Sequence, residues 1–237
     1  MRRTIRGILA ALALSAGIML TATACTITTV DPGYVPPPPL PALEQLKQAP
    51  LEDAATFSGG EGVLNFVTED RNMVCALTSA RGEDLNLPYE HNGFADSANN
   101  KLDTVPVAHC ELAAYPKAEP ADVKDDCAGT GLGYLGGTAL LTPDKASYGG
   151  CRSGLTQMES EFGPKGSKDG AISKMPVLSD GQNVERNGLR CSAYNGGVSC
   201  GNLSAGVAFF ISKDRYELIS GGGIKATAPP SEASKTP

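Results

Sequence analysis

The stretch Asn187–Cys200, which reads NGLRCSAYNGGVSC, decides the fold that we expect, and the segment Gly206–Tyr216, GVAFFISKDRY, extends it. Cys191 and Cys200 flank an Asn-Gly-Gly turn, and Asn-Gly between apolar residues is a strong hairpin signal. The apolar run that follows is typical of a buried strand. The pattern predicts a hairpin closed by its own disulfide, with a buried strand after it.

Two adjacent aromatic residues in that strand, Phe209 and Phe210, must point to opposite sides, because side chains alternate along a strand. If Phe209 faces the core, Phe210 either faces a partner surface or meets a second layer of the protein. A fully buried central strand explains the pair as well as a partner surface does. The sequence leaves these alternatives open.

The composition of the chain favours a turn-rich β domain. The 237 residues include 28 Gly and 17 Pro, few aromatic residues and no Trp. This mix suits short strands and turns better than a helical bundle. We therefore expect a mainly β fold over residues 51–220: a single, disulfide-stapled domain of antiparallel sheet, sandwich or barrel-like. Long loops are expected at 81–104 and 160–180.

The first residues have the features of an export signal. A basic start is followed by an uncharged apolar segment from Gly7 to Leu20, which is too short for a comfortable membrane span. Small residues then precede Cys25, as in a bacterial lipobox. We expect a signal peptide at 1–24 and a diacylglycerol group on Cys25, since more than one acyl chain gives lasting attachment. The alternative is an ordinary secretory signal, with Cys25 incidental.

The segments that flank the β domain have a different composition. Residues 25–50 contain a proline run, Pro36–Pro39, which favours an extended spacer between the lipid and the domain. A short helix is expected over Leu40–Gln48, and Pro50 ends it. The last segment, 221–237, is rich in Gly, Ala, Ser and Pro, so we expect a disordered tail.

Six cysteines remain when Cys25 is set aside, and all six can pair. Cysteines outside the cytoplasmic membrane argue for disulfides, although sequence alone does not choose among the connectivities. Local order suggests Cys75–Cys110, Cys127–Cys151 and Cys191–Cys200. The absence of C-x-x-C and the unsuitable spacing of the histidines argue against zinc and against a redox enzyme, so no metal is expected.

The charge of the chain bears on its partners. Three of the 20 basic residues precede Cys25, so the mature chain carries 17 basic residues against 26 acidic ones. This balance opposes nucleic acid as a partner. The expected partners are the membrane, through the lipid on Cys25, and a protein of the cell envelope.

Residues with catalytic potential are few. His91, beside Glu90 in the loop 81–104, is the better candidate for a general base or metal ligand, whereas His109 is expected on a strand facing solvent. No G-x-S-x-G nucleophile motif is present. Gly131–Gly136 matches G-x-G-x-x-G, but a strand and a turn follow it, so close strand packing explains it better than a nucleotide. We identify no catalytic residues and expect no cofactor.

Several spaced motifs lie along the chain: Asn72–Cys75, Val107–Leu112, Cys127, Cys151, Gly188–Ser192, Gly197–Cys200 and Gly206–Leu218. Together they resemble a family of secreted proteins and lipoproteins of mycobacteria, corynebacteria and their relatives. The resemblance covers about residues 57–220, and its C-terminal part is the more specific. It implies consecutive pairing of the six cysteines and a mainly β fold, and it carries no agreed activity. The long segment 81–104 departs from the family pattern.

These observations favour a non-catalytic, lipid-anchored envelope protein that acts as an accessory or scaffolding subunit of a membrane or cell-wall complex. Its expected location is the outer face of the cell membrane, with secretion as the alternative. Two other functions stay open: a binding module for an envelope lipid or small ligand, and a cell-wall hydrolase. Whether the chain is an enzyme is not settled by its sequence.

Overall fold

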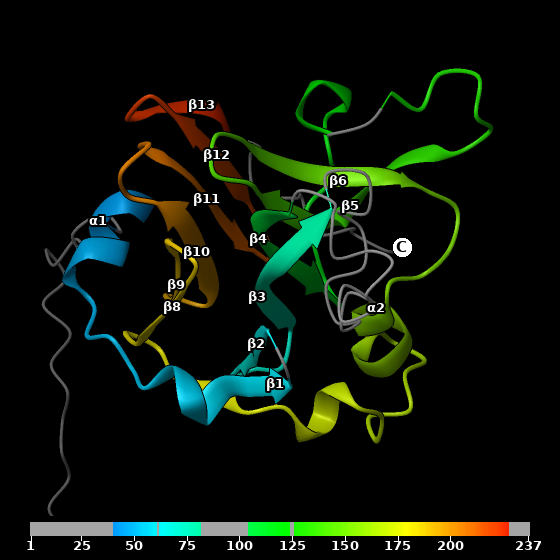
Figure 1. Cartoon of the computed structure of the whole chain (residues 1–237). Coiled ribbons are helices and arrows are strands. Elements are labelled where there is room, and N and C mark those ends of the chain that lie inside the picture. The colour runs from blue at the N-terminus through cyan, green and yellow to red at the C-terminus, as the bar shows by residue number, and fades with distance from the viewer. Residues whose placement is uncertain (1–39, 61, 82–103, 124–125, 228–237) are drawn as a thin grey trace, which may run out of the picture. The chain divides into compact units, whose positions relative to one another are not determined.

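Two β-sheets form the part of the chain that the structure, a computed structural model, describes: residues 40–60, 62–81, 104–123 and 126–227. Strands from the two sheets contact each other, β3 to β6 on one side and β8, β9, β11 and β12 on the other, and short helices lie around them (Figure 1). None of the described helices is long and apolar enough to cross a membrane. The expected mainly β, antiparallel sandwich is confirmed.

Each sheet is close to a meander, in which consecutive strands are neighbours. The first sheet has the order β1-β2-β3-β4-β5-β6, and the short β7 pairs with β2 in parallel. The second runs β13-β12-β11-β10-β9-β8. The strands of the first sheet are β1 (Ser58–Gly60), β2 (Val63–Thr68), β3 (Met73–Arg81), β4 (Thr104–Leu112), β5 (Gly133–Leu141), β6 (Ala146–Arg152) and β7 (Val177–Leu178). Those of the second are β8 (Asn183–Arg186), β9 (Leu189–Tyr194), β10 (Gly197–Asn202), β11 (Val207–Ser212), β12 (Tyr216–Ser220) and β13 (Gly223–Thr227).

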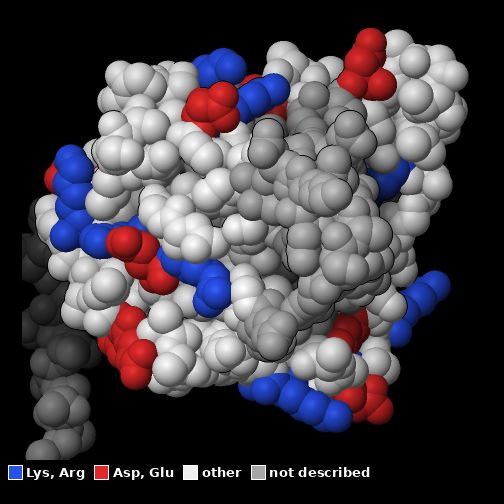
Figure 2. Space-filling model, viewed as in Figure 1, with Lys and Arg blue, Asp and Glu red and all other residues white. Residues whose placement is uncertain are grey.

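The surface over these layers carries both signs of charge. On the face shown in Figure 2, Lys and Arg side chains of the described residues lie among Asp and Glu side chains. The chain as a whole has a formal charge of -6. Recognition on this face therefore depends on local groups rather than on one broad field.

The stretch that decides the fold forms the hairpin of β9 and β10. Gly197 pairs with Tyr194, so the turn consists of Asn195 and Gly196. Both have positive φ, 51° and 69°, as the two central residues of a type I′ turn require. The hairpin predicted from the Asn-Gly signal is thus present, and Cys191 lies directly opposite Cys200.

Strand β11 explains the two adjacent phenylalanines. All six of its residues are buried. Phe209 belongs to the core between the sheets, whereas Phe210 packs in a second cluster on the outer side with Ala42 and Leu46. Ala42 and Leu46 come from helix α1 (Ala42–Gln48), so α1 is the second layer that Phe210 meets.

Helix α1 is fastened to the second sheet by its C-terminal carbonyls. Asn183 donates from Nδ2 to the carbonyl oxygens of Leu46 and Ala49, both at 2.9 Å. Arg190 donates to the Leu46 carbonyl at 3.0 Å. These bonds satisfy groups that every helix end leaves unpaired. The helix was predicted, but it belongs to the folded domain, which therefore begins before residue 51.

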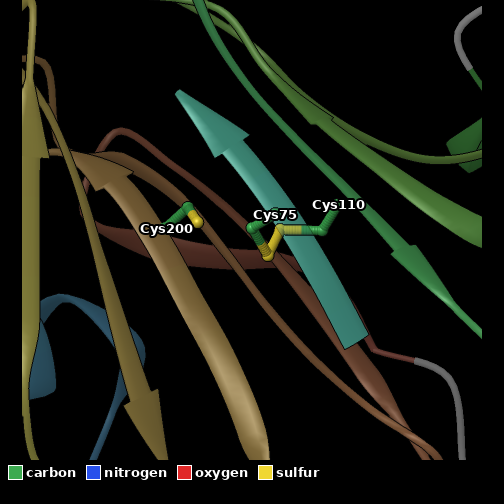
Figure 3. Close-up of side chains that lie close together, drawn as sticks. All are labelled: Cys75, Cys110 and Cys200. Atoms are coloured by element: carbon green, nitrogen blue, oxygen red, sulfur yellow. A yellow bond between two sulfur atoms is a disulfide. The ribbon is translucent and has the colours of Figure 1, made fainter. Parts of the chain in front are cut away.

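Three disulfides join the cysteines that local order had paired: Cys75–Cys110, Cys127–Cys151 and Cys191–Cys200. The first and third each link residues directly opposite each other on neighbouring strands, with Cα atoms 4.1 Å apart. Cys75, Cys110 and Cys200 have sulfur atoms within 4.8 Å of one another (Figure 3). Because these sulfurs are bonded in disulfides, the group is not a metal site.

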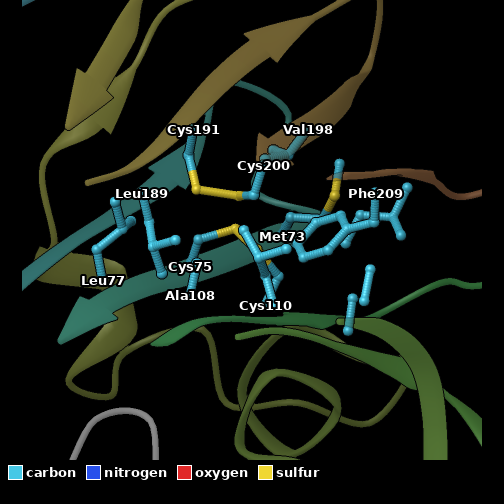
Figure 4. Close-up of a cluster of buried hydrophobic side chains, with 14 of the residues drawn as sticks. Met73, Cys75, Leu77, Ala108, Cys110, Leu189, Cys191, Val198, Cys200 and Phe209 are labelled. Carbon is cyan, nitrogen blue, oxygen red and sulfur yellow. A yellow bond between two sulfur atoms is a disulfide. The ribbon is translucent and has the colours of Figure 1, made fainter. Parts of the chain in front are cut away.

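The two facing disulfides lie in the core, among Met73, Leu77, Val198 and Phe209 (Figure 4). One of these disulfides belongs to the first sheet and the other to the second. Their sulfur atoms therefore form part of the core of a sandwich that has few aromatic residues. A domain with three disulfides belongs to an oxidising compartment outside the cytoplasm.

Two segments that we expected to be irregular contain regular structure. Residues 160–180 were predicted to be a surface loop, but they include the end of α2 (Gln157–Phe162), the 3-10 turn Ile172–Lys174 and β7. The buried carboxylate of Glu161 accepts from the backbone N–H groups of Ile172, at 3.1 Å, and of Ser173, and so orders this chain segment. This order comes from hydrogen bonds between one side chain and distant backbone N–H groups. Hydrophobic periodicity in the sequence does not reveal such bonds.

The boundary predicted for the disordered tail, residue 221, is also too early in the chain. Residues Gly223–Thr227 form β13, which pairs with β12. Gly221 and Gly222, with φ of 62° and 83°, make the tight turn between these strands, a conformation that glycine adopts without strain. The glycine-rich composition marks a hairpin turn here, and only residues after 227 stay a predicted tail.

In the described part of the chain, the other helical segments are 3-10 turns at Ala54–Phe57 and Pro120–Asp122. The second of these lies in the connection between β4 and β5 and contacts β6. Two tyrosines fasten this connection to the sandwich. Tyr216 donates to Oδ2 of Asp122 at 2.6 Å, and Tyr148 donates to the carbonyl of Pro116 at 2.7 Å. The two rings stack at 4.0 Å between centroids.

Candidate functional site

A pocket of about 240 Å³ lies on the outer face of the first sheet, over β4, β5 and β6 and beside the start of α2. Ala108, Cys110 and Leu112 of β4 point into the core. The alternation of a strand therefore turns His109 and Glu111 to the outer face, where both line the pocket. Among the described residues, the lining is His109, Glu111, Thr138, Leu140, Ser147, Gly149, Gly150, Cys151, Arg152 and Thr156.

Small residues on β5 and β6 make room for this pocket. Gly149 has φ of 85°, and a Cβ built there would lie 2.6 Å from the Cβ of Ala118. Gly149 therefore cannot readily be replaced by a larger residue. A side chain at Gly149 would thus meet Ala118 and Val123 of the core cluster, so the short pocket wall on β5 and β6 comes from Gly150, Thr138 and Ser147.

In the glycine motif Gly131–Gly136, close packing holds for Gly136, whereas Gly131 has φ of 74° and open space around it. A Cβ on Gly136 would lie 2.3 Å from the carbonyl oxygen of Pro116. The pairing of β5 with β6 also shifts register between Leu135 and Ala139, which is the mark of a β-bulge. No helix follows the glycines, so the geometry of a nucleotide-binding loop is not formed.

Glu111 is the carboxylate of the pocket wall. Its side chain is buried, with 7% of the residue exposed, and it accepts from the backbone N–H of Met158 at 3.0 Å. Burial raises the pKa of this carboxyl, and hydrogen bonds from Met158 and Thr156 only partly oppose the rise. Glu111 therefore holds the start of α2 in place and also carries acid–base potential at the pocket.

Arg152 has its charge matched within the protein. It forms an ion pair with Glu159 of α2 at 2.8 Å and donates to the carbonyl of Gly136 at 2.7 Å and to the hydroxyl of Tyr115 at 3.2 Å. Burial alone would raise the pKa of Glu159, but hydrogen bonds from Thr156 and Tyr115 and the charge of Arg152 outweigh it and lower that pKa. The pair is thus an ionised, nearly neutral unit at the end of the pocket.

His109 differs from its prediction. It lies on β4 as expected, but only 6% of it is exposed, so it does not face solvent. The alternation rule places it correctly on the outer face of the sheet. That face is a pocket wall rather than open surface at this point, which a single strand cannot reveal.

His91, Glu90 and the lipidation residue Cys25 all fall outside the described residues. The pocket was not predicted, because its lining comes from three strands and a loop that only the folded chain brings together. The available signal was the spacing of His109 and Glu111, two residues apart on one predicted strand.

Within the described lining, the serine hydroxyl and the imidazole lie on strands that are not neighbours. Leu140 on β5 pairs with His109 on one side and with Ser147 on the other, so it stands between the hydroxyl and the imidazole. A serine nucleophile needs a base within hydrogen-bond reach. The lining therefore offers hydrogen-bonding groups around a cavity.

The comparisons with known proteins add no family. No protein-family model matches the chain, and neither a curated protein nor a solved structure matches it. The resemblance to mycobacterial and corynebacterial envelope proteins stays a prediction. The mainly β domain with three disulfides is a finding of the structure.

Proposed function

We propose that this chain is an extracytoplasmic binding module for a small polar ligand, held at the outer face of the cell membrane by a lipid on Cys25. The observation that carries the proposal is the pocket of about 240 Å³ with His109 and Glu111 buried in its wall. Concave sites with a few convergent polar groups are where proteins commonly bind small molecules. The volume lies below the roughly 300–1,000 Å³ of pockets for drug-sized ligands, so the ligand is small.

Ligand screening with matched variants tests the binding function. Ser147→Leu puts a larger side chain into the pocket, and Thr138→Val removes a hydroxyl with little change in shape. A ligand that raises the melting temperature of the mature protein should lose its effect in Ser147→Leu and weaken in Thr138→Val. The intact masses of both variants, measured without reductant, check that the three disulfides have formed. A broad screen of small polar compounds without any pocket-dependent ligand would refute the proposal.

The lipid anchor is tested separately from the pocket. Replacement of Cys25 with Ala removes the sulfur that would carry the diacylglycerol, so the protein should move from the membrane fraction to the medium. Ligand binding by the released protein should be unchanged. Retention of Cys25→Ala at the membrane would show that another segment anchors the chain.

An accessory role in an envelope complex is a second candidate, favoured by two exposed leucines. Leu155 is 72% exposed and Leu132 is 39% exposed. Both lie at the same end of the β5–β6 hairpin, because Gly133, next to Leu132, pairs with Arg152. Contiguous exposed apolar groups mark protein contacts, and these two leucines would form the centre of such a surface.

A pull-down experiment tests the accessory role. A membrane protein that copurifies with the tagged chain in mild detergent should be lost with Leu155→Ser. It should be kept with Ile224→Ser, a matched change at another exposed site, since Ile224 is 61% exposed on β13. A partner that is equally retained by both variants would rule out the leucine surface.

A further inference from the structure

Apolar side chains are exposed on the side of the domain where the described chain begins. Leu40, directly before the N-cap residue of α1, is 36% exposed. Leu43 and Leu203 are half-buried and pack against the outer cluster that α1 forms with the second sheet. Ile224 on β13 is 61% exposed. We call Leu40, Leu43, Leu203 and Ile224 the α1 surface.

Strand register and the direction of α1 bring these residues to one side of the domain. Ile224 pairs with Ile219 on β12, and directly paired residues point to the same face of a sheet. Ile219 packs with Ala42 of α1 in the outer cluster. Helix α1 contacts β9, β10 and β11 (Figure 1). Its C-terminal end is bonded to β8 and β9, so its N-terminal end, next to Leu40, points toward β12 and β13.

The charged groups beside these apolar side chains are matched within the protein. Glu44 and Lys47 of α1 form an ion pair at 2.8 Å. Arg215 pairs with Glu217, and its guanidinium lies over the ring of Phe210 at 4.4 Å from the centroid. Glu217 is paired with Phe210 in the sheet and so faces the same outer side. Paired charges make it less costly for the surrounding apolar groups to leave water.

We propose that the α1 surface rests on the bilayer that holds the lipid on Cys25. The proposal rests on the lipid anchor put forward above. Its occupant follows from where the chain leads, because the 14 residues 26–39 join Cys25 to Leu40. A segment of this length spans at most about 50 Å when fully extended.

Such a tether keeps the α1 surface close to the membrane at all times. Tethering through a short linker gives an effective concentration on the order of millimolar, so a weak contact is populated without further binding energy. Among the described residues, Leu40 is the nearest to Cys25 along the chain. The side of the domain that carries Leu40 therefore faces the bilayer, and its apolar groups enter the boundary between headgroups and acyl chains.

The absence of tryptophan from the chain allows a direct test, because one introduced Trp reports its own surroundings. Lipidated protein with Ile224→Trp, or with Leu155→Trp as the matched control, is reconstituted into phosphatidylcholine vesicles with and without dibrominated acyl chains. Bromine quenches a Trp that reaches the acyl boundary, so Ile224→Trp should lose emission about twofold. Leu155→Trp should lose none, because Leu155 is 72% exposed beyond the β5–β6 hairpin of the other sheet.

A second change separates the surface from the affinity of Trp itself for membranes. Leu40→Asp places a charge in the contact and should weaken the quenching of Ile224→Trp. Equal quenching at both Trp positions, no quenching at either, or quenching that Leu40→Asp leaves unchanged overturns the proposal. Flotation of the vesicles reports the anchor separately. Protein that floats without Ile224→Trp quenching keeps the anchor and loses the α1 contact, whereas protein that does not float overturns both.

Discussion

At the residue scale, one tyrosine hydroxyl holds the connection between β4 and β5 in place. The hydroxyl of Tyr216 donates to Asp122 at 2.6 Å and accepts from the backbone N–H of Glu119 at 3.3 Å. Hydrogen bonds to charged groups contribute about 1.5–3 kcal/mol. Tyr216→Phe should therefore lower the free energy of unfolding by about that amount, measured by urea denaturation. Tyr194→Phe, near the β9–β10 turn, is the matched control and should change little.

Glu111 should make stability depend on pH in an unusual direction. Its pKa is raised above the ordinary value of 4.5 by burial, so the folded state holds the proton more tightly than the unfolded state does. The contribution of Glu111 is therefore greatest below 4.5 and is lost as pH rises through the folded-state pKa. Glu111→Gln should gain stability relative to wild type over that rise, in urea unfolding at a series of pH values. A constant difference between the two proteins would contradict the assignment.

Residue types also show how far the sequence could predict the candidate site. The alternation of β4 identifies His109 and Glu111 as neighbours on one face. It does not say that Gly149, Gly150 and Ser147 lie opposite them, because that depends on strand register and on the bulge in β5. The burial of His109 likewise follows from long-range packing. The candidate residues His91 and Glu90 were chosen as a histidine beside a carboxylate in a long predicted loop, and that prediction is untested.

At the scale of elements, α1 should behave as part of the domain. It covers Phe210 and Ala208 with Ala42 and Leu46, and fully burying one large apolar side chain contributes roughly 1.5–3 kcal/mol. A chain that starts at Leu51 should lose several kcal/mol of stability and bind a hydrophobic dye. A chain that starts at Leu40 keeps the helix and should match the full mature protein. Equal stability of the two truncated chains would show that α1 is dispensable.

Elements with a local signal were predictable, and elements held by distant side chains were not. The Asn-Gly turn fixes the β9–β10 hairpin, and Pro50 marks the end of α1. The short elements within 160–180 depend on Glu161, which lies on α2 and bonds to backbone ten or more residues later. Such contacts leave no periodic trace in the sequence.

At the scale of the whole molecule, each disulfide should contribute to the free energy of unfolding according to the length of the loop that it closes. Cys75–Cys110 and Cys191–Cys200 are both buried cross-strand pairs, but their sequence separations are 35 and 9. In the loop-entropy account, the longer closure stabilises by about 1 kcal/mol more. Replacement of the first pair with alanines should therefore cost more than replacement of the third, by urea unfolding of both double variants. The reverse order would show that packing, not loop entropy, dominates.

The two sulfur pairs that face each other in the core also affect how the chain matures. Since the sulfurs of Cys75, Cys110 and Cys200 lie within 4.8 Å of one another, proximity alone does not select the correct partner during oxidation. The register of β3 with β4 and of β9 with β10 makes that selection, because it sets each cysteine directly opposite its partner. Backbone pairing therefore selects the disulfide partners: the hairpins must form before oxidation if the cysteines are to be joined as they are in the folded protein.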